Sequence, residues 1–69
     1  MEKRSFSIVG HRTSIALEPE FWTGLETIAA ERQLSLAGLI REIDESRTTT
    51  NLSSAVRLAV LAWYRDGAG

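Results

Sequence analysis

Residues 11–17, HRTSIAL, have the alternation of a short strand. Ile15 and Leu17 share one face, and the opposite face carries Arg12, Ser14 and Ala16, as expected for a half-buried strand. A single strand leaves its backbone donors and acceptors unpaired, and we find no convincing antiparallel partner elsewhere in the chain. We therefore predict that this strand pairs with the same strand of a second copy.

Residues 5–9 also alternate, with Phe6 and Ile8 on one side, and Gly10 then interrupts the pattern. A glycine within a strand pattern often marks a bulge or a bend. We expect residues 1–10 to form an arm or an extended strand that lengthens the ribbon or wraps around the partner.

The rest of the chain has helical spacing and predicts three helices, at residues 19–33, 35–46 and 52–65. Pro19 suits the first turn of a helix, where its missing N–H is not needed. Gly24 lies inside the first helix and lowers its intrinsic stability by about 1 kcal/mol relative to alanine, so tertiary packing must offset the loss.

Helix starts and apolar faces complete this prediction. Ser35 is a good N-cap for the second helix. The third helix is apolar over most of its circumference, which is typical of a buried helix, so we expect a partner subunit to cover part of it. Residues 47–50 are expected to form a loop, and residues 66–69 a frayed tail.

The chain of 69 residues predicts one small domain, and such a domain needs an additional source of stability. It has no cysteine and only one histidine, which argues against disulfides and a structural zinc site. We therefore expect oligomerisation to supply the additional stability. No run is long enough for a membrane span, so we expect a soluble cytoplasmic protein.

Charge is unevenly distributed. Residues 1–17 carry three basic residues against one acidic residue, a net of +2, whereas the remainder carries five basic against eight acidic residues, a net of −3. A dimer would place two basic segments side by side, which favours contact with nucleic acid. No nucleophile motif, glycine-rich phosphate loop or metal cluster is found, so we expect neither enzyme activity nor a cofactor.

The order of strand, helix, tight joint and helix resembles the ribbon-helix-helix DNA-binding family, which includes the MetJ-, Arc- and CopG-type repressors. The resemblance rests on RTSIALEPE at residues 12–20 and LSLAGLIRE at residues 34–42. The segments at residues 10–14, 18–22 and 51–55 resemble a subgroup of short bacterial ribbon-helix-helix proteins. The resemblance implies a mainly α fold with one short β-strand. Two chains would form an intertwined homodimer with an intermolecular antiparallel ribbon, and each would add a C-terminal helix.

The resemblance also implies a set of DNA contacts. Family members insert the ribbon into the major groove, so the outward strand residues Arg12, Ser14 and Ala16 are expected to contact bases. Family members also bind phosphates with the backbone at the start of the second helix, which here means Ser35 and Leu36. The basic arm residues Lys3 and Arg4 are further candidates for phosphate contact.

These expectations describe a dimeric, sequence-specific DNA-binding protein, most simply a bacterial transcriptional repressor that binds double-stranded DNA. The alternative is that the same dimer serves as a protein-interaction or assembly module, for example as an antitoxin-like partner of another protein. Its net acidity and the apolar Ala16 at an outward position favour this second hypothesis.

Overall fold

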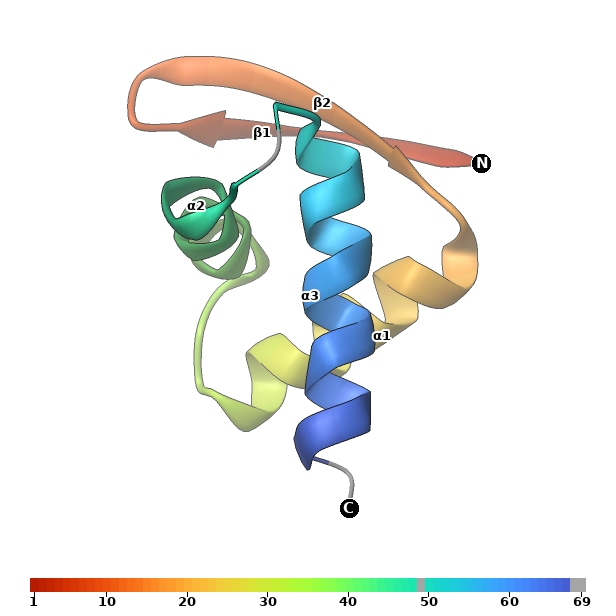
Figure 1. Cartoon of the computed structure of the whole chain (residues 1–69). Coiled ribbons are helices and arrows are strands. Elements are labelled where there is room, and N and C mark those ends of the chain that lie inside the picture. Colours follow the sequence, from red (N-terminus) through yellow and green to blue (C-terminus); the bar gives the residue numbers. More distant parts are fainter. Residues whose placement is uncertain (49, 68–69) are drawn as a thin grey trace.

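Two antiparallel strands lie across one end of three helices (Figure 1). The computed structural model describes residues 1–48 and 50–67. The elements are β1 (Glu2–Ile8), β2 (His11–Leu17), α1 (Pro19–Glu31), α2 (Leu36–Ser46) and α3 (Leu52–Gly67). The predicted strand, the two following helices and the additional C-terminal helix are therefore confirmed.

The prediction that residues 11–17 have no partner within the chain is wrong. β1 and β2 form a hairpin whose pairs run from Glu2 opposite Leu17 to Ile8 opposite His11. Val9 and Gly10 make the turn with φ values of 49° and 78°. Two successive positive φ values allow the tightest hairpin connection, which matches the twist of the strands. Gly10 therefore reverses the chain and does not merely interrupt a strand.

One face of the hairpin packs on the helices. Ile15 and Leu17 of β2 are fully buried, and Ile8 of β1 is 7% exposed. Half-buried Phe6 packs against the same core. The helices contribute the remaining buried side chains: Trp22, Leu25, Ile28, Ala29, Leu39, Ile40, Ile43, Ala55, Val56 and Val60. The hairpin is thus held by apolar contacts along its inner face, while its outer face stays free.

Individual residues explain where α1 and α2 begin and how closely α3 can pack against α1. Pro19 occupies the first turn of α1, and the Ser35 hydroxyl accepts a hydrogen bond from the backbone N–H of Gly38 at 2.9 Å. α1 ends at Glu31, two residues before the predicted end. A Cβ at Gly24 would lie 3.0 Å from Val60 Cγ1 of α3. The glycine therefore permits the close approach of α1 and α3, which is the packing gain its low helix propensity requires.

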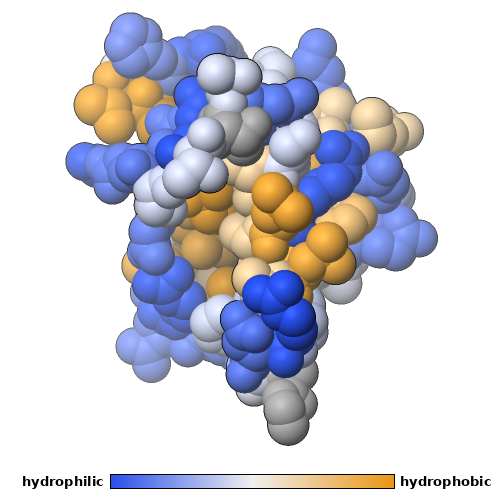
Figure 2. Space-filling model, in the orientation of Figure 1, coloured by the Kyte–Doolittle hydropathy of each residue, from blue (hydrophilic) through white to orange (hydrophobic). Residues whose placement is uncertain are grey.

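Within one chain α3 is covered on one side only. Ala55, Val56 and Val60 are buried, but Leu58 is 60% exposed and Leu61 is 58% exposed. Figure 2 shows apolar side chains gathered at the centre of this face, with hydrophilic ones around them. The expectation of a frayed tail from residue 66 is wrong for Asp66 and Gly67, which continue the helix, and residues 68–69 lie outside the described residues.

Candidate nucleic-acid interface

The outer face of the hairpin is built from three cross-strand pairs. β1 contributes every second residue from Lys3, and β2 contributes every second residue from Arg12, because successive side chains of a strand point to opposite faces. The pairs are Lys3 with Ala16, Ser5 with Ser14, and Ser7 with Arg12. Small and cationic side chains occupy this face, and none of these six residues is acidic.

The middle of this face is the serine pair. Ser5 Oγ and Ser14 Oγ lie 3.1 Å apart and share a hydrogen bond. A hydroxyl both donates and accepts, so each serine can also hydrogen bond to a ligand. The row therefore offers adaptable polar groups between a lysine near one end and an arginine near the turn.

Lys3 and Arg12 differ from the other basic side chains of the protein. The remaining six, all arginines, each form an ion pair with a carboxylate; they are Arg4, Arg32, Arg41, Arg47, Arg57 and Arg65. Among the residues that the structure describes, Lys3 and Arg12 form no ion pair. The two cations without a carboxylate partner thus lie on the same face, although the chain has a net charge of −1.

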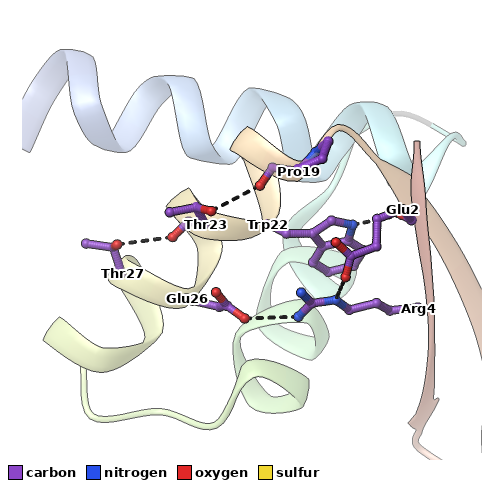
Figure 3. Close-up of polar contacts among 7 residues, drawn as sticks. All are labelled: Glu2, Arg4, Pro19, Trp22, Thr23, Glu26 and Thr27. Atoms are coloured by element: carbon purple, nitrogen blue, oxygen red, sulfur yellow. Dashed lines mark hydrogen bonds and ion pairs between the residues drawn. The ribbon is translucent and has the colours of Figure 1, made fainter.

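Arg4 lies on the opposite face of β1 from Lys3. Its guanidinium pairs with Glu2 and with Glu26, the latter at 3.0 Å, and stacks 4.7 Å from the centroid of Trp22 (Figure 3). Hydrogen bonds to Glu2 and Glu26 raise the pKa of Arg4. The structure therefore does not bring Arg4 together with Lys3 and Arg12. Glu2 and Glu26 already neutralise the positive charge of Arg4, as a DNA phosphate would.

Trp22 fixes the hairpin to α1. Its indole Nε1–H donates to the backbone oxygen of Glu2 at 2.8 Å (Figure 3), and only 1% of the residue is exposed. The Phe6 ring lies 5.9 Å from it, tilted by 33°. This contact sets the position of β1, and hence of the outer face, relative to the helices.

Ser35 and Leu36 lie apart from the outer face within one chain. They lie at the start of α2, which belongs to the helical layer beneath the inner face of the hairpin (Figure 1). The Ser35 hydroxyl already caps α2 by accepting from Gly38. The joint contact of Ser35 and Arg12 with one DNA site stays a prediction.

Ser5 and Ser7 lie on the outer face but were not among the predicted site residues. Their signal was the alternation of residues 5–9, which predicts the same strand geometry as residues 11–17. Extending that alternation toward the N-terminus also places Lys3 and Arg4 on opposite faces. Alternation alone does not show that this strand pairs with the next one, which is what brings Ser5 and Ser7 beside Ser14 and Arg12.

No group of three or more metal-ligating side chains occurs in residues 1–48 and 50–67. Within the same ranges, no helix has the length and hydropathy needed to cross a bilayer.

The two-stranded antiparallel sheet followed by helices is consistent with a ribbon-helix-helix fold. Residues 1–64 match the family model described as "Ribbon-helix-helix domain". The chain belongs to the ribbon-helix-helix domain family. No curated protein and no solved structure gave a significant match. Ribbon-helix-helix domains are non-catalytic DNA-binding and regulatory modules, and they typically bind DNA as dimers.

Proposed function

We propose that this protein is a sequence-specific DNA-binding regulator that acts as a homodimer, and that it represses transcription in the bacterial cytoplasm by blocking access of polymerase to its operator. One observation carries the proposal: Lys3 and Arg12 are the basic residues without an ion pair in the described chain, and both lie on the outer face of the hairpin. An unpaired cation can bind DNA without first losing an intramolecular partner.

The dimensions and chemistry of the hairpin suit the major groove. That groove admits a two-stranded β-ribbon, whose outward side chains then meet base edges. Arg12 can donate two hydrogen bonds to O6 and N7 of a guanine, Ser14 can donate or accept, and Ala16 can contact a thymine methyl group. Ser5 and Ser7 add a second row of hydroxyls from β1.

Phosphate contacts come from the borders of this face. Lys3 lies at the open end of the hairpin, where its ammonium group can reach the DNA backbone. The backbone N–H groups at Ser35 and Leu36 lie at the positive end of α2, which favours an anion. We assign these helix contacts to the dimer, because ribbon-helix-helix domains typically bind DNA as dimers.

Selection from a random pool of duplex DNA, followed by sequencing, tests this function. Wild-type protein should enrich a repeated or palindromic motif. Arg12→Ala should lose about 1–3 kcal/mol of discrimination at one base pair of each half-site. Lys3→Ala should weaken binding to all sequences and reduce the slope of log affinity against log salt by about 1.

Arg41→Ala is a matched control, because Arg41 is exposed on α2 and already pairs with Glu45 at 3.4 Å. This variant should retain the wild-type motif and salt slope. Enrichment of the same motif with equal selectivity by Arg12→Ala would contradict the assignment of Arg12 to base contact.

A second function, as a protein-interaction or assembly module, is favoured by the exposed apolar side chains of α3, which are Leu58, Leu61 and Tyr64. Electrophoretic mobility shifts with DNA fragments at low and moderate salt discriminate between the two functions. A DNA-binding regulator shows salt-sensitive affinity, whereas a module that binds only proteins shows none.

A further inference from the structure

An open groove lies along α1 where α3 crosses it (Figure 1). The groove consists of two cavities, of about 270 and about 440 Å³, and Tyr64 of α3 lines both of them. The α1 residues that line the cavities are Glu20, Phe21, Thr23, Gly24, Thr27 and Glu31. Positions 20, 24, 27 and 31 follow at intervals of three and four residues, so they share one side of the helix. We call this surface the α1–α3 groove.

The floor of the α1–α3 groove is apolar. Gly24 has no side chain, and a Cβ at this position would lie 3.0 Å from Cγ1 of buried Val60. The hydroxyls of Thr23 and Thr27 donate to the backbone oxygens of Pro19 and Thr23, each at 3.1 Å (Figure 3). Because α1 itself satisfies these hydroxyls, the floor does not require a polar partner. A molecule bound here therefore gains affinity mainly by burying apolar surface.

A carboxylate without an ion pair lies at each end of the groove. Seven of the nine acidic residues of the chain pair with an arginine. Glu20 and Glu31 form no ion pair within residues 1–48 and 50–67, and each lines one of the two cavities. They lie three helical turns apart on α1, a distance of about 16 Å along its axis. The groove thus combines an apolar centre with negative charge at both ends.

We propose that the α1–α3 groove binds an amphipathic helix of another protein. Apolar side chains of that helix fill the cavities on either side of Tyr64, and two basic residues three turns apart pair with Glu20 and Glu31. On a helix, residues three turns apart share one face, which matches the spacing of the two carboxylates. This inference deepens the second function named above, because it gives the protein-interaction surface and the chemistry of its partner. It does not depend on the DNA contacts.

Charge distinguishes this partner from DNA and from a second copy of the chain. The carboxylates at both ends repel a phosphate backbone. In the part of the chain that the structure describes, the basic residues without an ion pair are Lys3 and Arg12, and both lie on the strands. A second copy therefore has no helix that presents two unpaired cations to the groove.

A pair of synthetic peptides tests the chemistry of the partner. Both are helices of leucine, alanine and glutamine with one apolar stripe. They differ only at two positions about 11 residues apart, which are lysine in one peptide and glutamate in the other. Fluorescence anisotropy of the labelled peptides measures their dissociation constants. Wild-type protein should bind the lysine peptide at least about fivefold more tightly than the glutamate peptide. Equal affinities would overturn the proposal.

Charge reversal locates the bound peptide in the groove. Glu20→Lys/Glu31→Lys should invert the preference, so that the glutamate peptide binds at least about fivefold more tightly. An inverted preference also shows that this variant folds. Glu42→Lys/Glu45→Lys is the matched control, since it changes the net charge equally but on α2, where both carboxylates already form ion pairs. The control should keep the wild-type preference, and a preference inverted there as well would overturn the assignment to the groove.

Two further measurements separate the other outcomes. Glu20→Gln/Glu31→Gln should leave the dimer dissociation constant within about twofold of wild type in analytical ultracentrifugation. A larger change would make the groove an interface between two copies and overturn the proposal. DNA selection with the wild-type protein separates the groove from DNA binding. Motif enrichment without a peptide preference defeats the groove alone, whereas a peptide preference without motif enrichment supports the groove and defeats the DNA-binding function.

Discussion

Replacing Trp22 with phenylalanine tests how the hairpin is held against the helices. The substitution removes the indole Nε1–H that donates to the Glu2 oxygen at 2.8 Å. It keeps an aromatic ring near Phe6 and Arg4, which lie 5.9 Å and 4.7 Å from the Trp22 ring in the wild-type protein. The change therefore isolates the hydrogen bond and the volume of the second ring.

The expected loss of stability is the sum of two parts. A hydrogen bond of this kind contributes about 1 kcal/mol to the free energy of unfolding. Trp22 is only 1% exposed, so the smaller ring leaves a cavity. About 40 Å³ of lost volume at roughly 24 cal/mol per Å³ adds about 1 kcal/mol. Together these make a decrease of about 2 kcal/mol in the free energy of unfolding, a large share for a small domain.

Urea unfolding followed by far-ultraviolet circular dichroism measures this decrease, with equal slopes required for the comparison. Trp63→Phe is the matched control, because Trp63 lies half-buried on α3 and no such bond to β1 involves it. The control should lose markedly less stability. If Trp22→Phe cost less than about 0.5 kcal/mol, or no more than the control, the hairpin would not depend on this contact.

Three further outcomes follow from particular contacts. Gly24→Ala should destabilise the protein by on the order of 1 kcal/mol in thermal melts, because the added Cβ would lie 3.0 Å from buried Val60, and overpacking at about 1–3 kcal/mol exceeds the gain in helix propensity. Arg4→Ala should lower the melting temperature yet leave the salt slope of DNA binding unchanged, because carboxylates already neutralise Arg4; a slope reduced as much as in Lys3→Ala would contradict this. Hydrogen bonds to the Glu18 carboxylate, first from the backbone N–H of Glu18 and then from Arg57, lower the pKa of Glu18 below its ordinary 4.5. The ionised carboxylate therefore stabilises the folded protein above pH 4.5, and this stabilisation is lost as pH falls through the lowered pKa. The melting temperatures of wild type and Glu18→Gln should converge below about pH 4.5.

Local signals in the sequence were sufficient for most elements and for one row of the candidate site. The alternation of residues 11–17 predicts that Ile15 and Leu17 are buried and that Arg12, Ser14 and Ala16 face outward, and the structure places them so. Pro19 and Ser35 mark the starts of two helices for reasons confined to the first turn of each.

The tertiary structure decided which strand pairs with β2 and which cations are free. Alternation assigns faces within a strand, but it does not say whether the pairing partner belongs to the same chain. In the described chain, the tight turn at Val9–Gly10 allows β2 to pair with β1 of the same chain. Ion pairing is likewise non-local, because Arg4 meets Glu26 and Arg57 meets Glu18 only after α1 packs against β1 and α3.

The sequence by itself therefore determined the periodic features: strand faces, helix starts, apolar stripes and the excess of positive charge near the N-terminus. Only the folded chain paired six arginines with carboxylates while it left Lys3 and Arg12 without ion pairs among the described residues. The physical reason is that periodicity depends on neighbouring residues, whereas the neutralisation of a charge depends on which distant side chain the packing brings within reach.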